Sequence, residues 1–124
     1  MQQDNQYLVD ILHAAQRIIE KTSKLSREDF YDDVKVQDSV VRRLLTISKA
    51  ARRISEGTVT QLDRLPWDAM KNLKSQLSQE ENDIDPAVLW AITQTEIPLL
   101  IQQIGLRAVA EETSHYTPLQ ASQL

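Results

Sequence analysis

The sequence contains no cysteine, only two glycines and few aromatic residues. The absence of cysteine excludes disulfide bonds, thiol catalysis and thiolate zinc sites, and it is compatible with a reducing cytoplasm. Two glycines in 124 residues argue against a β protein rich in tight turns. Because aromatic residues make up 5 % of the chain, leucine, isoleucine, valine and alanine must fill the core.

Long apolar runs and a net positive charge are also absent. No apolar stretch approaches the roughly 18 residues typical of a membrane span. The N-terminus has no basic region followed by an apolar run, so no signal peptide is expected and a cytoplasmic location is predicted. The formal net charge of −4 excludes a general positive field for nucleic acid, although it leaves room for a local basic patch.

Apolar residues recur at helical spacing along most of the chain. Helices are predicted over residues 5–23, 36–54, 66–77 and 86–112, with a short helical turn that begins after Ser26. The sequence therefore predicts an all-α fold, an antiparallel bundle of four main helices plus a short helical turn. Residues 1–112 are expected to form a single domain, and the polar, proline-broken residues 113–124 a flexible tail.

Short local signals mark where several of these helices begin and end. Ser26, followed three residues later by Asp29, is typical of an N-cap pair. Asp85 before Pro86 combines a capping acceptor with a residue whose φ suits the first helical turn. Gly57 follows the helix over 36–54 and is expected to form its left-handed C-cap. Pro98 is expected to kink or restart the last helix near Thr95.

The two histidines offer little chemistry. His13 has no second histidine three or four residues away, and a closed metal site needs several convergent ligands. His115 and Tyr116 are adjacent in a region expected to be solvated. No metal or cofactor is therefore predicted, and the two separated glycines exclude a glycine-rich phosphate-binding loop.

A basic run lies in the second long helix. It contains five cations without an intervening acid: Arg42, Arg43, Lys49, Arg52 and Arg53. At about 100° per residue, Arg42, Lys49 and Arg53 fall on one side, roughly opposite the apolar stripe. This side is either a solvated helix face or a contact for phosphate or for an acidic partner. Without interleaved aromatic residues, stacking on single-stranded bases is not supported.

Several segments, in this order and spacing, resemble the HepT-like proteins of the HEPN superfamily. They are YLVDIL at 7–12, QDSVVRRL at 37–44, ISKAARRIS at 47–55, PW at 66–67, KNLKSQLSQEEN at 71–82, DIDPAVLW at 83–90 and IPLLIQQI at 97–104. The resemblance implies a small bacterial all-helical protein, a homodimer, that acts as the toxin partner of an Mnt-type nucleotidyltransferase antitoxin. The sequence does not show which helices would form the dimer interface.

In the resembled family, one helix carries a ribonuclease motif. The motif consists of an arginine, usually a polar neighbour, then a histidine, one residue and a tyrosine. Aligned without gaps, Lys74 takes the arginine position and Ser75 the polar neighbour, while Gln79 takes the histidine position and Glu81 the tyrosine position. All four residues depart from the pattern. The pair His115 and Tyr116 does not replace it, because no residue separates the two.

Three of the replacements remove chemistry that the motif uses. Glutamine does not titrate, so Gln79 cannot accept a proton from a ribose hydroxyl. Lys74 keeps a positive charge but lacks the forked bidentate grip of arginine on phosphate. Glu81 has no hydroxyl, whereas the antitoxin in the resembled systems adds adenylate to the motif tyrosine.

Three interpretations follow from these residues. The first is a HepT-like protein that has lost its endoribonuclease site and acts as a binding or regulatory partner. The second is an active metal-independent ribonuclease that uses a shifted set of residues around Lys74 and Glu81, with a carboxylate as base. The third is a protein that binds nucleic acid, without cleaving it, through Arg42, Lys49 and Arg53.

Overall fold

The computed structural model describes the backbone of residues 2–77 and 85–115, and the side chains of residues 3–73 and 85–106. All regular structure in this part of the chain is α-helical. The helices are α1 (Gln2–Thr22), α2 (Arg27–Tyr31), α3 (Val34–Arg53), α4 (Glu56–Gln61), α5 (Trp67–Leu77), α6 (Pro86–Gln94) and α7 (Glu96–His115). The prediction of an all-α fold is confirmed.

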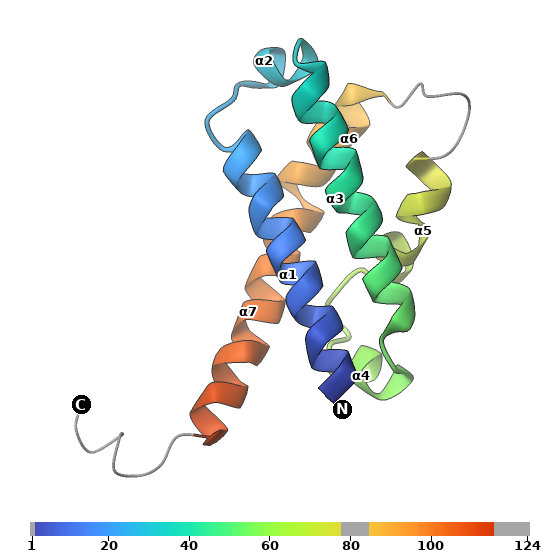
Figure 1. Cartoon of the computed structure of the whole chain (residues 1–124), viewed down its shortest axis with the longest axis vertical. Helices are drawn as coiled ribbons and strands as arrows, with labels where there is room; N and C mark the ends of the chain where they lie inside the picture. The colour runs from blue at the N-terminus through green and yellow to red at the C-terminus, as the bar shows by residue number, and fades with distance from the viewer. Residues whose placement is uncertain (1, 78–84, 116–124) are drawn as a thin grey trace, which may run out of the picture.

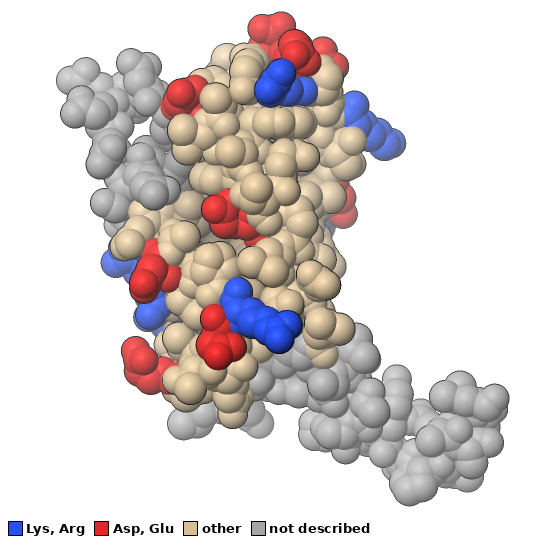
Figure 2. Space-filling model, turned by 180° about the vertical axis from the view of Figure 1, so that it is seen from behind, with Lys and Arg blue, Asp and Glu red and all other residues tan. Residues whose placement is uncertain are grey.

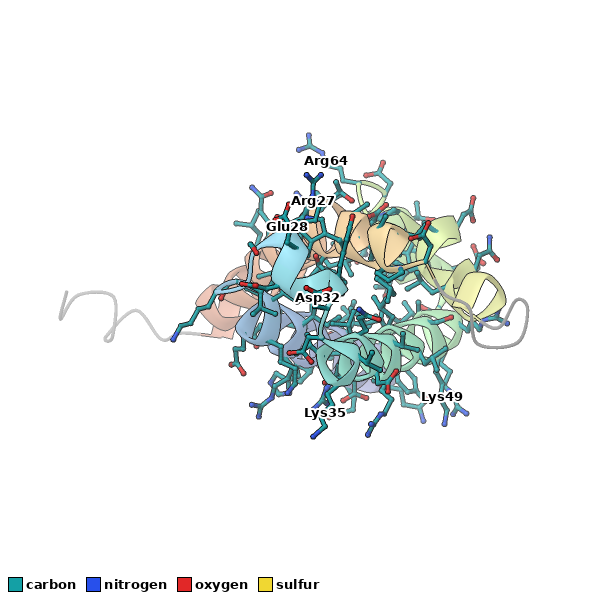
Figure 3. All side chains as sticks on the ribbon, turned by 90° about the horizontal axis from the view of Figure 1, so that it is seen from above. Arg27, Glu28, Asp32, Lys35, Lys49 and Arg64 are labelled. Atoms are coloured by element: carbon teal, nitrogen blue, oxygen red, sulfur yellow. The ribbon has the colours of Figure 1, made fainter. Side chains whose placement is uncertain are left out.

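The long helices alternate in direction, as Figure 1 shows. α1 and α3 run antiparallel side by side, α5 packs on the far side of α3, and α6 and α7 return behind α1. Seen from above, α1 and α3 form one layer and α5, α6 and α7 form the other (Figure 3). This is the predicted antiparallel bundle, with α2 and α4 as short connecting helices.

One apolar stripe on each long helix fills the space between the layers. The fully buried members from α1 and α3 are Ile11, Ala15, Ile18, Val40, Leu44, Ile47 and Ala51. Phe30 of α2 is also buried, and its ring centroid lies 5.3 Å from that of Trp90 in α6. Such a tilted aromatic pair contributes about 1 kcal/mol beyond its burial. Phe30 is therefore the apolar anchor of this short helix.

The N-cap signals at Ser26 and Asp85 act as predicted. The Ser26 hydroxyl accepts a hydrogen bond from the Asp29 amide at 3.0 Å, and the Asp85 carboxylate accepts one from the Ala87 amide at 2.9 Å. α6 ends at Gln94 and α7 begins at Glu96, so Pro98 lies in the first turn of a new helix, where it removes no hydrogen bond. α7 continues past its predicted end to His115. Residues 116–124 of the predicted tail lie outside the described residues.

The prediction of a left-handed C-cap at Gly57 is wrong. α3 ends at Arg53, Ile54 is extended with φ −79° and ψ 138°, and Gly57 lies within α4. The predicted linker after Gly57 is thus partly helical. The turn between α3 and α4 does not need glycine, because a carboxylate from the first turn of α1 binds it from outside.

That carboxylate belongs to Asp4, which is only 4 % exposed. Its Oδ1 accepts from the Ser55 amide at 3.1 Å, and its Oδ2 accepts from the hydroxyls of Ser55 at 2.5 Å and Thr58 at 2.7 Å. The hydrogen bonds from the Ser55 hydroxyl, and next from the Thr58 hydroxyl, lower the pKa of Asp4, while burial opposes them. The start of the chain is thereby fixed to the α3–α4 turn.

Replacing this carboxylate should reduce stability in a pH-dependent way. Because the folded pKa of Asp4 is lowered from its usual value of 3.8, its stabilisation is present above that pH. It is lost as the pH falls through the lowered folded pKa. We therefore expect Asp4→Asn to have a lower Tm than the wild type near neutral pH, with a gap that narrows below about pH 4.

Thermal unfolding followed by circular dichroism across this pH range measures the gap. Asp10→Asn is the matched control, since Asp10 lies on the same helix and accepts only an exposed hydrogen bond from Gln6. An unchanged Tm for Asp4→Asn, or a gap of constant size at all pH values, would contradict the assigned role.

Candidate functional site

The four motif positions fall on and just beyond α5. Lys74 and Ser75 lie in the backbone of α5, but their side chains are outside the described residues. Gln79 and Glu81 lie outside the described residues altogether. What the structure does define is the first half of the helix that leads into this segment, and the surface on which that helix rests.

The beginning of α5 is fixed by Trp67. Its indole nitrogen donates to the Leu62 carbonyl at 2.8 Å, and its amide donates to the Leu65 carbonyl at 2.8 Å. Met70 and Leu73 follow on the same side and are buried. The apolar stripe predicted for this helix is confirmed at these three residues. It directs α5 onto α3, the main neighbour of α5 in the bundle.

The seam between α3 and α5 contains a polar contact that was not predicted from the sequence. The backbone carbonyl of Lys71 accepts from the Ser48 hydroxyl at 3.1 Å and from Nε and Nη2 of Arg52 at 3.0 and 2.8 Å. Ser48 is 1 % exposed, so its hydroxyl would lack a partner without this bond. Two residues one helical turn apart on α3 therefore bind the turn of α5 that precedes Lys74.

The sequence contained a signal for this contact. Ser48 and Arg52 are four residues apart, which places them on one side of a helix. The charge pattern alone groups Arg52 with the other cations of the basic run. In the structure Arg52 is directed to α5, whereas Arg42, Lys49 and Arg53 are exposed elsewhere on α3.

Removing the hydrogen-bond donors of Arg52 should make local unfolding of α5 easier. We expect Arg52→Met, which keeps a long apolar stem, to speed hydrogen exchange of the α5 amides by about fivefold, equivalent to about 1 kcal/mol for one hydrogen-bonding group. Hydrogen exchange followed by mass spectrometry measures this change. Arg53→Met is the control, because Arg53 makes no contact of this kind with the described residues. Equal exchange in the two variants would show that the contact does not hold α5.

The cations named from the sequence lie together on the outer face of α3. Arg42, Lys49 and Arg53 are all exposed, and so is Lys35 at the start of the same helix. Lys35 and Lys49 point away from the layer formed by α5, α6 and α7 (Figure 3). The structure thus brings together the three residues predicted from the sequence and adds a fourth.

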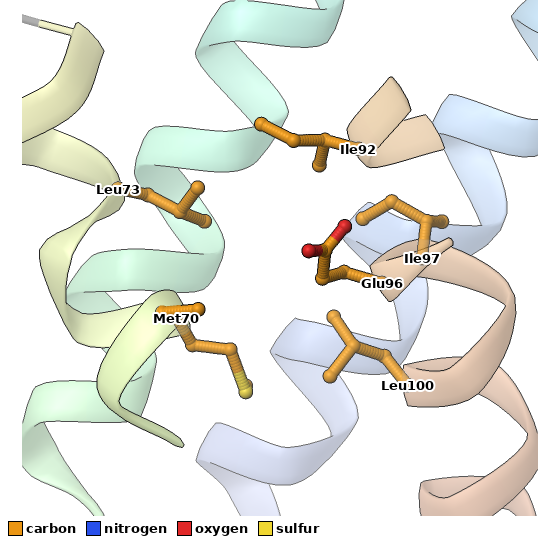
Figure 4. Close-up of a pocket in the computed structure, with 7 residues that line it drawn as sticks. Met70, Leu73, Ile92, Glu96, Ile97 and Leu100 are labelled. Carbon is orange, nitrogen blue, oxygen red and sulfur yellow. The ribbon is translucent and has the colours of Figure 1, made fainter. Parts of the chain in front are cut away.

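A small pocket lies between α5 and the α6–α7 pair (Figure 4). Its volume is about 80 Å³, and its lining consists of Ala69, Met70, Leu73, Ile92, Glu96, Ile97 and Leu100. The Glu96 carboxylate points into it and accepts a hydrogen bond from the Thr95 hydroxyl. A single carboxylate among apolar side chains lacks the second polar group that acid–base catalysis or phosphate binding requires.

The described residues contain neither a metal-binding cluster nor a membrane-spanning helix. His13 is exposed on α1, and no group of three or more histidine, aspartate or glutamate residues in this part of the chain could hold a metal ion. No helix within the described ranges is both long and apolar enough to cross a membrane.

The fold and the α3–α5 seam define the class of protein. It is a small helical bundle in which the long helix α3 supports α5, and the four positions of the ribonuclease motif fall on and just beyond α5. Comparison with known families then specifies it. Residues 11–106 match the HepT-like family, described as ribonuclease HepT-like. The chain belongs to this HepT-like ribonuclease family.

Relatives with ribonuclease names support this assignment. A protein of Thermococcus cleftensis named "Probable ribonuclease HepT" is 33 % identical over 94 residues, which cover 76 % of this chain and 86 % of the relative. Two Methanocaldococcus jannaschii proteins with RNase in their names are similar over comparable lengths. One is 29 % identical, covering 79 % of this chain and 81 % of the relative. The other is 28 % identical, covering 81 % of this chain and 92 % of the relative. No solved structure matches the chain significantly.

Proposed function

We propose that this chain is a HepT-like protein that has lost endoribonuclease activity and acts as a binding or regulatory partner. The observation that carries the proposal is the set of residues at the motif positions. Gln79 stands where a histidine is expected, and loss of a general base typically costs about 10²- to 10⁴-fold in rate. Lys74 and Glu81 replace the arginine and the tyrosine.

The charge of the segment supports the same proposal. Between residues 74 and 83, the acids Glu80, Glu81 and Asp83 outnumber Lys74, the one cation, for a net charge of −2. Negative charge at this position repels a phosphate backbone. An active site shifted onto Lys74 and Glu81 is not favoured for the same reason.

The supporting scaffold is intact around the altered motif. α5 is anchored through Trp67 and is bound to α3 by Ser48 and Arg52. A well-formed helix without a set of catalytic residues suits a protein that acts by binding a partner through its surface and not by catalysis. An Mnt-type nucleotidyltransferase is the partner class that the family resemblance suggests, in a toxin–antitoxin setting. Glu81 offers no tyrosine hydroxyl for adenylation.

Restoring the motif tests the proposal directly. We expect the purified wild type to leave RNA intact. We expect the combined variant Lys74→Arg, Gln79→His and Glu81→Tyr to cleave it, with a gain of about 10²-fold or more from the histidine. Denaturing gels of end-labelled RNA measure cleavage.

The three single variants are the controls, and each should remain inactive because no one residue completes the set. Cleavage by the wild type that is lost in Gln79→Ala would refute the loss of activity. A combined variant that stays folded and inactive would show that the scaffold no longer supports the reaction.

We further propose that a second copy of this chain binds to the outer face of α6 and α7. Residues 86–106 contain one charged residue, Glu96, although 26 % of the whole chain is charged. Val88 and Leu106 are 48 % and 59 % exposed on these helices. Figure 2, which shows the molecule from behind, has a broad area that is largely uncharged apart from an acidic patch near its centre, with further mixed charges toward its ends.

Self-pairing is favoured because a two-fold interface places a surface patch against its own copy. On a chain with a net charge of −4, most faces would meet their copies with like charges, whereas this face would not. Nucleic acid is disfavoured as the occupant, since residues 86–106 contain no lysine or arginine.

A charge introduced on this face should prevent pairing. We expect the wild type to sediment at about twice the 14.2 kDa mass of one chain, and Val88→Glu to raise the dimer dissociation constant at least about tenfold. Analytical ultracentrifugation measures both. Val34→Glu is the matched control: Val34 is 64 % exposed and, like Val88, lies in the first turn of its helix. A monomeric wild type, or equal effects of the two variants, would exclude this interface.

A further inference from the structure

The charge of this acidic protein is distributed very unevenly. α3 contains six lysines and arginines and one aspartate, so its net charge is +5. Because the whole chain has a net charge of −4, the residues outside α3 together carry −9. The positive potential is therefore concentrated on a single helix and is not a general property of the surface.

Four of these cations form a stripe on the outer side of α3: Lys35, Arg42, Lys49 and Arg53. The steps between them are seven, seven and four residues, which keeps them within about 40° of one another around the helix. The stripe spans about 27 Å at 1.5 Å per residue. All four cations are exposed, and Lys35 and Lys49 point away from the layer that contains α5 (Figure 3).

These cations are available to a ligand. The ion pairs among the described residues join Arg17 to Glu20 at 3.3 Å and Arg27 to Glu28 at 3.8 Å, and neither involves α3. Asp38, the one acid on α3, is exposed and makes no such pair. An exposed lysine or arginine without a partner carbonyl or carboxylate can exchange its water for phosphate oxygens.

We propose that this basic stripe, Lys35, Arg42, Lys49 and Arg53, binds the phosphodiester backbone of single-stranded nucleic acid without cleaving it. Besides the four cations, the exposed side chains along this side of α3 are Asp38, between Lys35 and Arg42, and Thr46, between Arg42 and Lys49; no exposed aromatic residue lies on α3. A protein interface normally places apolar or aromatic residues at its centre and avoids lysine there. A line of cations without such anchors suits phosphates instead.

The same composition sets the specificity of the stripe. No aromatic side chain is present to stack on a base, so binding depends on the backbone and not on the base sequence. RNA and DNA strands should bind alike, because the contacts are to phosphates. The stripe lies on α3 and shares no residue with the four motif positions, so this inference does not depend on whether the ribonuclease site is lost. The two proposals also have different measurements: denaturing gels measure cleavage, whereas the salt dependence of fluorescence anisotropy measures binding.

The test is fluorescence anisotropy with a labelled RNA of roughly 16 nucleotides, at the upper end of common site sizes, and with DNA of the same sequence. Four phosphate contacts predict a slope of about −3 for log K against log salt, because each contact on a single strand contributes about −0.7. Between about 50 and 200 mM salt, the affinity of the wild type should fall about 50-fold.

Two double variants with equal charge changes separate the stripe from the net charge. Arg42→Gln with Arg53→Gln removes half of the stripe, so its affinity should fall only about sevenfold over the same salt range. Arg27→Gln with Arg64→Gln is the control, since both arginines point to the opposite side of the molecule (Figure 3), and it should keep the slope of the wild type. Circular dichroism confirms the folding of both.

Several results would overturn the inference. Binding that is absent or independent of salt would exclude backbone contacts. Equal losses in the two double variants would assign the effect to net charge. RNA binding without DNA binding would exclude contacts through phosphates alone. Binding of poly-glutamate in place of nucleic acid would identify the ligand as an acidic protein segment.

Discussion

The placement of α5 depends on α3. α5 has α3 as its main neighbour, and the carbonyl of Lys71 accepts hydrogen bonds from Ser48 and Arg52 on that helix. The apolar residues Met70 and Leu73 bring the helices together, but apolar packing alone is non-directional. The hydrogen bonds to one carbonyl fix the turn of α5 that meets α3, and with it the orientation of α5 on the bundle.

α3 thus combines three roles on three sides. Its apolar side, with Val40, Leu44 and Ile47 fully buried, forms the centre of the core. Its polar side holds α5, and its outer side carries a stripe of cations. The three roles are compatible because a helix with 3.6 residues per turn directs the side chains that serve them to different sides of its axis. Adjacent residues can then serve different purposes: Lys49 lies in solvent directly after Ser48, which is buried in the seam.

The sequence predicted those features whose partners lie close along the chain. Helical spacing gave the long helices, and Ser26 and Asp85 cap amides within three residues of themselves. The prediction at Gly57 was wrong because glycine after a helix is a strong local signal for a C-cap. The group that binds this turn is instead Asp4, which lies 51 residues before Ser55 in the sequence. The contact of Ser48 with Lys71 spans 23 residues and was missed for the same reason. Tertiary hydrogen bonds between helices leave no periodic pattern in a sequence.

The positions of the charges distinguish this chain from what its family membership alone would suggest. A ribonuclease concentrates positive charge where phosphate must be held during the reaction. Here the segment at the motif positions is net negative, while α3 carries +5 on the surface of an acidic protein. Electrostatic attraction would therefore bring a nucleic acid to the outer face of α3, whereas the acids around Glu81 would repel it. Lys35 and Lys49 on that face point away from the layer that contains α5 (Figure 3), so a strand bound there would contact α3 on a different side from the seam with α5.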